Sequence, residues 1–271
     1  MRILVVCTAN ICRSPSVQRL LLDALAEDPA CAGIEVRSAG TQAIAGVHGC
    51  TLAPALAGRA EDHRSTPLTT DLVEWADLIL TAARDHRSGV VTRLPAARTR
   101  TFTVRQAGRI ADWLDEAGMI DAARQRAATP DGWSDRIPPG DPRRDVMPLP
   151  PDLDARWGWL IEELDAARGA VPAAGPVPAA GPGTARGTGP GTGRGAGPEL
   201  AQGAAGSEGG TGRGRRWLRG RGAPQAPPEW MHPDDVPDPH VHGMHLHPVA
   251  HEAIVEATGS VAALIRRVAA G

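Results

Sequence analysis

The sequence contains no tyrosine, only one phenylalanine and only four cysteines, and all its positive charge comes from arginine because lysine is absent. Four cysteines in 271 residues are too few for a disulfide scaffold, and their spacing suggests reactive thiols instead. No apolar run approaches the roughly 20 residues of a membrane helix, and none near Met1 suffices for a signal-peptide core. We therefore expect a cytoplasmic protein with no membrane partner.

Glycine and proline are concentrated in one part of the chain. Residues 169–228 contain 18 glycines and 9 prolines, with seven arginines and two glutamates. A segment of this composition buries too little apolar surface to offset the conformational entropy lost on folding. We expect residues 169–231 to be a disordered basic insert, interpreted as a solvated spacer rather than as a tether to nucleic acid.

The remaining chain alternates strand-like and helix-like stretches. Short apolar runs predict strands over 3–6, 34–38, 76–81 and 99–104. Ser14 and Pro15 mark the start of a first helix, with Ser14 as the cap and Pro15 in the first turn. Further helical patterns lie over 68–75, 106–114, 154–168 and 248–268. This alternation predicts a three-layer α/β/α fold with a four-stranded parallel sheet, which binds ligands beyond the carboxyl ends of its strands.

The first predicted strand is followed by the most informative segment, Cys7 to Pro15. A loop of this length before a helix can point its backbone N–H groups inward, beside the positive end of the helix. It would then bind a phosphate dianion, and the planar guanidinium of Arg13 would donate hydrogen bonds to two of the phosphate oxygens. Cys7 is expected to act as a thiolate and to form a cysteinyl-phosphate. The expected phosphate-binding loop consists of Thr8, Ala9, Asn10, Ile11, Cys12 and Arg13.

At these residues the sequence resembles the low-molecular-weight protein tyrosine phosphatases, which carry Cys-x-Gly-Asn-x-Cys-Arg-Ser-Pro near the N-terminus and an Asp-Pro-aromatic general acid near the C-terminus. The second pattern resembles Asp238-Pro239-His240. The resemblance covers most of 1–115 and 232–268, and includes Ser38-Ala39-Gly40-Thr41. It implies a metal-independent phosphomonoester hydrolase, without a cofactor, that acts on phosphotyrosine-type groups of a phosphorylated protein.

The resemblance implies three catalytic roles. Cys7 attacks phosphorus, Arg13 binds the phosphoryl oxygens, and Asp238 protonates the leaving phenolate before it activates the hydrolytic water. Asp-Pro pairs also begin at Asp28 and Asp141, where we interpret them as turn starters. Asp238 is preferred as the acid because an imidazole and the C-terminal helix follow it.

The resemblance also implies a supporting network and a redox partner. Asn10 holds the loop in a strained turn, and Ser14, Ser38 and His63 supply hydrogen bonds to it. Cys12 lies close enough to Cys7 in the family to form a reversible disulfide, so peroxide is expected to inactivate the enzyme reversibly.

Three departures from the family pattern concern the substrate pocket. The glycine of the loop is Ala9 here, which requires a negative φ at that residue. His240 replaces the aromatic residue that follows Asp-Pro in the family. Ile44 and Val47 stand where the family often has a second aromatic residue. We therefore expect walls made of an imidazole and aliphatic groups.

Two other functions remain open. An arsenate reductase of the same fold would need two more redox thiols, for which Cys31 and Cys50 are the only candidates. A catalytically weak phospho-binding module would instead make the arginine-bearing insert the functional part.

A histidine-rich run near the C-terminus has the capacity to bind metal. We expect a surface loop without metal, because no cysteine or carboxylate pair shares a helical face with it. The run consists of His232, His240, His242, His245, His247 and His251. The expected division is therefore a phosphatase domain of 1–115 and 232–271, a helical expansion over 116–168 and the insert of 169–231.

Overall fold

The computed structural model describes residues 1–171 and 231–271, which contain a sheet of four parallel strands in the order β2-β1-β3-β4. These strands are β1 (Arg2–Cys7), β2 (Glu35–Gly40), β3 (Leu78–Thr81) and β4 (Thr101–Thr103). The predicted strands and their parallel arrangement are thus confirmed. The predicted insert falls almost entirely outside the described residues.

Strand β1 lies in the interior of the sheet because both of its faces are apolar. Ile3 and Val5 belong to one core cluster, and Leu4 and Val6 belong to another on the opposite face. All four side chains are at most 1% exposed. A strand buried on both sides reads as a continuous apolar run, which is why the sequence pattern identified it.

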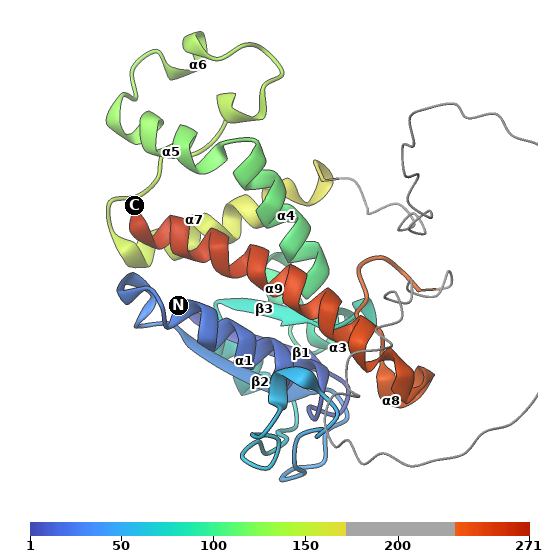
Figure 1. The fold of residues 1–271 in the computed structure, drawn as a ribbon. Helices are drawn as coiled ribbons and strands as arrows, with labels where there is room; N and C mark the ends of the chain where they lie inside the picture. The colour runs from blue at the N-terminus through green and yellow to red at the C-terminus, as the bar shows by residue number, and fades with distance from the viewer. Residues whose placement is uncertain (172–230) are drawn as a thin grey trace, which may run out of the picture. The chain divides into compact units, whose positions relative to one another are not determined.

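One face of the sheet is covered by helices α1 (Arg13–Leu25), α4 (Val104–Glu116) and α9 (His247–Ala270). In Figure 1, α9 lies between α1 and α4 and packs against both. Gly108 permits the close approach of α4 and α9, because a Cβ there would lie 2.9 Å from Cα of Ala257. The last helix of the chain thereby completes this layer.

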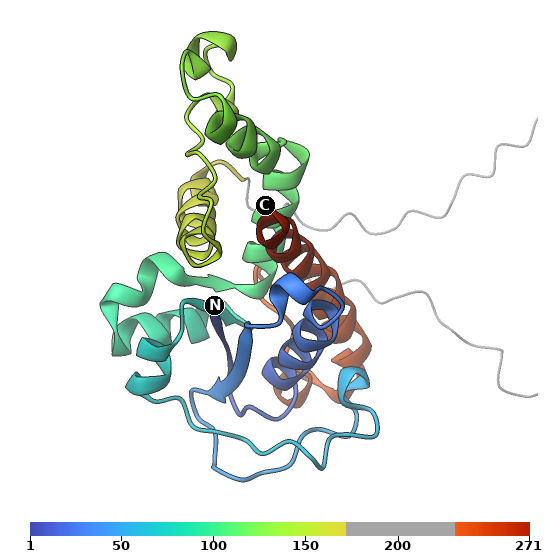
Figure 2. The same cartoon turned by 90° about the vertical axis from the view of Figure 1, so that its left-hand side faces the viewer.

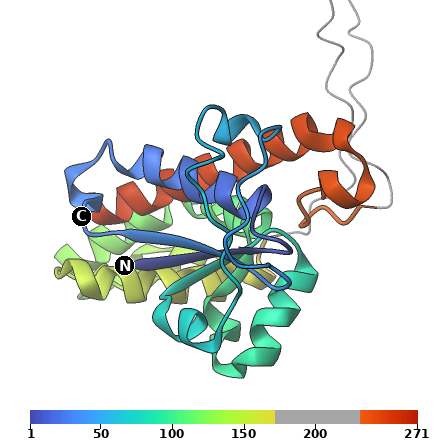
Figure 3. The same ribbon diagram turned by 90° about the horizontal axis from the view of Figure 1, so that it is seen from below.

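The other face is covered by α2 (Thr70–Trp75), α3 (Arg84–Arg93) and a 3₁₀ helix, Pro95–Arg100. Figure 3 shows the sheet edge-on between the two layers, with α1 and α9 on one side and the segment that contains α3 on the other. The three-layer α/β/α prediction is confirmed. Helix α3 was not expected from the sequence.

Residues 116–168 contain α5 (Met119–Ala128), α6 (Trp133–Arg136) and α7 (Leu153–Ala166). In Figure 2, α5 and α6 extend beyond the end of α4, away from the sheet. Trp133 is buried there, and its indole N–H donates to the carbonyl of Arg143 at 3.1 Å. The remaining helical turns are α8 (Pro239–His242) and the 3₁₀ segments Pro29–Cys31, Pro54–Leu56, Pro142–Arg144, Ala167–Gly169 and Met244–Leu246.

The strand order determines where a ligand can approach. From β1 the chain proceeds to β2 on one side, and later to β3 on the other, so the loops after β1 and β3 diverge and leave a crevice. Cys7 ends β1 at that crevice. Within residues 1–171 and 231–271, no helix is both long and apolar enough to cross a membrane.

Candidate active site

Residues 8–12 form the loop between β1 and α1. Among the non-glycine residues that the structure describes, only Asn10 has a positive φ, 55°. Ala9 therefore avoids the left-handed region, and its Cβ fits where the family has glycine. Ser14 was expected to cap α1, but the helix already begins at Arg13 and Ser14 lies within its first turn.

Cys7 lies at the base of this loop, and the residue is only 2% exposed. The backbone N–H of Asn10 donates to Sγ at 3.3 Å, and the Ser14 hydroxyl lies 2.9 Å from Sγ. A Cys7 thiolate can only accept, so in that state the donor is the Ser14 hydroxyl, which itself accepts from Asn10 Nδ2 at 2.9 Å and lies 3.5 Å from the carbonyl of Ala39. Two donors therefore converge on Cys7.

Asn10 is fully buried and connects the loop to its surroundings. Its Nδ2 also donates to Ser38 Oγ at 2.9 Å, and its Oδ1 accepts from the backbone N–H of Thr66 at 2.8 Å. Its carbonyl accepts from Nε2 of His63 at 2.7 Å. Ser14, Ser38 and His63, all singled out from the sequence, thus meet at one residue. Gln18 and Thr66 also take part but carry no sequence signal that could have identified them.

Gly40, at the end of β2, permits a close approach between two backbones. A Cβ at this position would lie 2.5 Å from the carbonyl oxygen of Thr8 and 2.9 Å from the backbone nitrogen of Asn10. Only glycine fits here without displacing the loop.

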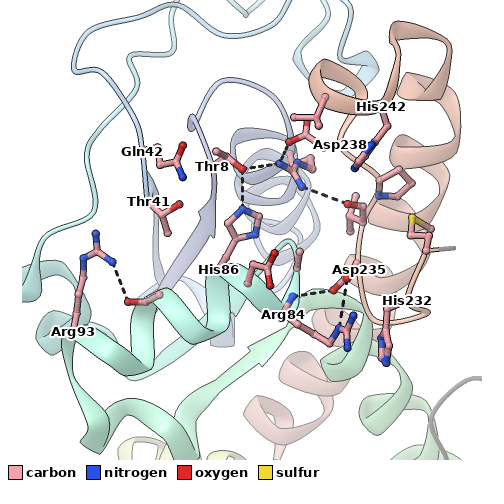
Figure 4. Close-up of a pocket in the computed structure, with 18 residues that line it drawn as sticks. Thr8, Thr41, Gln42, Arg84, His86, Arg93, His232, Asp235, Asp238 and His242 are labelled. Carbon is pink, nitrogen blue, oxygen red and sulfur yellow. Dashed lines mark hydrogen bonds and ion pairs between the residues drawn. The ribbon is translucent and has the colours of Figure 1, made fainter.

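Arg13 lies beside the loop and is 5% exposed. Its guanidinium donates to Thr8 Oγ1 at 3.0 Å and pairs with the carboxylate of Asp238. A further N–H lies 3.4 Å from the carbonyl of Val236. Figure 4 shows Asp238 and Thr8 on the same side of the pocket. The phosphate loop and the predicted acid therefore meet, although the insert separates them in sequence.

The segment before Asp238 is held against the loop after β3. The backbone N–H of Val236 donates to the carbonyl of Ala82 at 2.8 Å, and Asp235 accepts from the backbone N–H of Arg84 at 2.8 Å. Asp141, the competing Asp-Pro aspartate, instead pairs with Arg143 in the segment that packs on α5. Of the two, only Asp238 reaches Arg13.

A cavity of about 660 Å³ opens beside Arg13 and Asp238. Its described lining contains no phenylalanine, tyrosine or tryptophan, and it includes the acidic side chains of Asp85 and Asp235. Ile44 and Val47 were expected as walls, but they do not line the cavity and are 76% and 42% exposed.

His86 lines this cavity and was not anticipated from the sequence, because no motif includes it. Figure 4 shows it pointing at Thr8, and its Nε2 lies 2.9 Å from Thr8 Oγ1. Burial, reinforced by the positive charge of Arg13, lowers the pKa of His86 to about 4. The imidazole is therefore neutral at physiological pH.

His240 was also expected as a wall of the substrate pocket, and this expectation is wrong. Its ring does not line the cavity and instead lies edge-on to His247, with centroids 5.4 Å apart. Cys12 and Cys50 lie beside this pair, so cysteines do accompany the histidine-rich run. Burial, together with the neighbouring sulfurs of Cys50 and Cys7, raises the pKa of Cys12 to about 12.

Comparisons with known proteins place these observations in a family. Residues 2–117 match the family described as low molecular weight phosphotyrosine protein phosphatase. A protein-arginine-phosphatase from Geobacillus stearothermophilus is 37% identical over 108 residues, which are 39% of this chain and 70% of the relative. The low molecular weight protein-tyrosine-phosphatase Etp from Escherichia coli (strain K12) is 35% identical over 133 residues, 45% of this chain and 78% of the relative.

A solved structure of a YwlE mutant from Bacillus subtilis is 31% identical to this chain, with a TM-score of 0.36. The match covers 39% of this chain and 72% of the chain in that structure. The sequence matches carry the family assignment, because two relatives are matched over more than two thirds of their length at more than 30% identity. The chain therefore belongs to the low molecular weight phosphotyrosine protein phosphatase family and is one of its metal-independent protein phosphatases.

Proposed function

We propose that the protein hydrolyses phosphomonoesters through a covalent phosphoryl intermediate on Cys7. The observation that carries this proposal is the convergence of two donors on the Cys7 sulfur, next to a guanidinium that also reaches Asp238. A nucleophile, an anion-binding group and a proton donor are the minimum set for this chemistry.

The reaction then takes two steps. The Cys7 thiolate attacks phosphorus, the bond from phosphorus to the leaving oxygen breaks, and Asp238 gives its proton to that oxygen. In the second step Asp238 takes a proton from water as that water attacks phosphorus, and the sulfur leaves. Arg13 and the backbone N–H groups at the start of α1 stabilise the charge on the phosphoryl oxygens in both steps.

We propose phosphotyrosine in proteins as the substrate group. A phenolate is a leaving group that a positioned carboxylic acid can protonate, and Asp238 lies where the cavity meets Arg13. The aliphatic part of the lining, which includes Val241 and Pro237, offers apolar contact to a ring. The similarity to the Escherichia coli tyrosine phosphatase supports the same assignment.

Phosphoarginine, in which phosphorus is bonded to nitrogen rather than to oxygen, is a second candidate, favoured by Asp85 in the lining. Asp85 would attract the positively charged guanidinium that remains after the phosphoryl group leaves, whereas Asp235 already pairs with Arg84. The Geobacillus stearothermophilus relative carries the name of an arginine phosphatase.

The arsenate reductase alternative is disfavoured by the position of Cys31. This residue precedes β2, whereas Cys7 ends the neighbouring parallel strand β1, so the two lie at opposite ends of the sheet. Five residue steps at ~3.3 Å place them on the order of 16 Å apart, too far for thiol exchange. The binding-module alternative rests on arginines that lie outside the described residues.

The first test is hydrolysis of para-nitrophenyl phosphate by the wild type and Cys7→Ser, with EDTA and with or without vanadate. We expect vanadate-sensitive turnover in EDTA that the variant lacks. Two peptides with identical flanking residues, one with phosphotyrosine and one with phosphoarginine, then identify the substrate group from kcat/KM. Undiminished turnover by Cys7→Ser would rule out the covalent mechanism.

A further inference from the structure

Four groups that commonly bind transition metals meet beside the phosphate loop but outside the catalytic cavity. They are the thiols of Cys12 and Cys50 and the imidazoles of His240 and His247, and their ligand atoms all lie within 4.8 Å of one another. They come from the phosphate loop, the segment after β2, α8 and the first turn of α9. Neither the phosphate chemistry nor the acid step uses Cys50 or His247.

The spacing of these atoms is close to that of a tetrahedral zinc site. With Zn–S near 2.3 Å and Zn–N near 2.0–2.1 Å, a tetrahedron separates its ligand atoms by about 3.3–3.8 Å. Cys50 Sγ lies 3.3 Å from His247 Nε2, already within that range. The other separations are at most 4.8 Å, so small side-chain rotations suffice to complete the site.

His247 has the hydrogen-bond arrangement expected of a metal ligand. Its Nδ1 lies 2.8 Å from the carbonyl of Met244, to which an Nδ1 proton donates. The proton is then on Nδ1, and the lone pair of Nε2 points towards the Cys50 sulfur. Histidines that bind metals characteristically donate their other N–H to a carbonyl or carboxylate in this way.

The surroundings also suit a bound metal. Cys12 packs in a small apolar cluster with Ala53, Leu56 and Ala60, which keeps water from the sulfur side of the site. His247 is 5% exposed, whereas His240 lies at the surface and provides a route of access from solvent. A dry shell on one side and an open side on the other meet the requirements of a metal site.

We propose that Cys12, Cys50, His240 and His247 form a Cys₂His₂ zinc site that fastens the segment around Asp238 to the phosphate-binding loop. His240 follows Asp238 by two residues, and Cys12 immediately precedes Arg13. Binding replaces the two thiol protons with one Zn²⁺, so up to two protons are released, and both imidazoles bind in their neutral form. The site is structural, because all four positions of the tetrahedron are taken by protein.

The test uses the full chain carrying Cys7→Ser, reduced and stripped with EDTA, so that the catalytic thiol cannot contribute a ligand. After addition of zinc and exhaustive dialysis, we expect one equivalent of zinc per chain. Cobalt(II) in place of zinc should give the thiolate charge-transfer and intense visible bands of a tetrahedral site. Because this background has no turnover, the result is independent of the proposed phosphatase mechanism.

Matched variants then identify the ligands. Cys50→Ser and His247→Ala, each added to the Cys7→Ser background, should lower zinc affinity at least tenfold, whereas Cys31→Ala and His245→Ala should retain it. Cys31 is a buried cysteine elsewhere, and His245 is an exposed histidine of the same run. Melting in EDTA verifies that each variant folds, and zinc should raise the Tm only where the site is intact.

Two results would overturn the proposal. The first is that the chain retains no zinc after dialysis, although the thiols of Cys12 and Cys50 are shown to be reduced. The second is a full equivalent retained with equal affinity by Cys50→Ser and His247→Ala, which would mean that zinc binds elsewhere. A Cys12–Cys50 disulfide that forms in air and blocks zinc, with binding restored by reduction, would support the proposed proximity and the site.

Discussion

The guanidinium of Arg13 pairs with the carboxylate of Asp238, 225 residues later in the chain. Their side chains are only 6% and 14% exposed. The residue that would bind a phosphoryl group therefore also holds the acid in position. An incoming phosphate competes for the same guanidinium, so its binding is expected to loosen the pair and to free Asp238 for the leaving group.

Replacing Asp238 tests this relationship. Asp238→Ala should lower kcat for aryl phosphates by ~10²–10⁴-fold, the usual contribution of a positioned acid. It should also strengthen inhibition by inorganic phosphate, because Arg13 no longer has to leave a carboxylate. Steady-state kinetics with phosphate as inhibitor measure both effects.

Asp141→Ala is the matched control, since Asp141 also precedes proline and caps a short helical turn through its side chain. Its carboxylate pairs with Arg143 rather than Arg13. We expect kcat and phosphate inhibition to stay at wild-type values. A loss of turnover in Asp141→Ala, with none in Asp238→Ala, would reassign the acid.

Gly40→Ala should disable the phosphate loop without touching a catalytic side chain. The new Cβ would lie 2.5 Å from the carbonyl oxygen of Thr8, so the loop must move. Displacements near 1 Å cost up to ~10²-fold in rate, and we expect kcat/KM to fall at least tenfold. Gly33→Ala is the control, because no atom lies within 4 Å of its added Cβ. Equal kcat/KM in both variants would show that the close approach is unimportant.

His86 predicts a particular dependence of stability on pH. Its folded-state pKa of about 4 lies below the ordinary 6.5, so the unfolded chain binds the proton more readily. The stability linked to His86 is therefore fully present above pH 6.5 and is lost as the pH falls towards 4. Between pH 7 and 5 the loss is about 2 kcal/mol.

Urea unfolding at these two pH values checks this prediction. His86→Gln removes the titrating group, so its free energy of unfolding should fall less than that of the wild type over the same interval. Because other groups titrate equally in both proteins, the difference isolates His86. If the free energy of unfolding of the wild type fell no more than that of His86→Gln between pH 7 and 5, the buried imidazole of His86 would not be neutral.

Peroxide should inactivate the EDTA-treated enzyme reversibly. Oxidation of Cys7 gives a sulfenic acid, attack by the Cys12 thiol releases water, and the resulting disulfide is cleaved by dithiothreitol. In Cys12→Ser the sulfenic acid has no such partner, so further oxidation should make the inactivation permanent. Recovery of activity after reduction measures the difference, with Cys31→Ala as the control. Equal recovery in Cys12→Ser would exclude Cys12 as the partner.

Local patterns were sufficient to predict most of the sheet and the helix α9. Strand β1 is buried on both faces and is therefore a continuous apolar run. Helix α9 is buried along one face and therefore carries an apolar stripe. Helix α3 escaped prediction because only His86 and Val90 of its residues are buried. A helix with so few apolar contacts leaves no periodic signal.

The candidate site was predictable where it lies within a continuous motif. The loop from Cys7 to Arg13 was recognised because strand, loop and helix adjoin. His240 was misplaced because an Asp-Pro turn does not determine which side of its short helix faces the cavity. The meeting of Cys12 and Cys50 with two histidines was beyond prediction, since it depends on how loops from separate parts of the chain pack.

The position of α9 also determines when the enzyme becomes complete during synthesis. Translation adds ~5–20 residues per second, so Asp238 emerges roughly ten to forty-five seconds after Arg13. During that interval the nascent chain contains Cys7 and the phosphate-binding loop, but it lacks both Asp238 and α9, the helix that packs against α1. The protein should therefore acquire turnover only after α9 has been synthesised and has docked against α1.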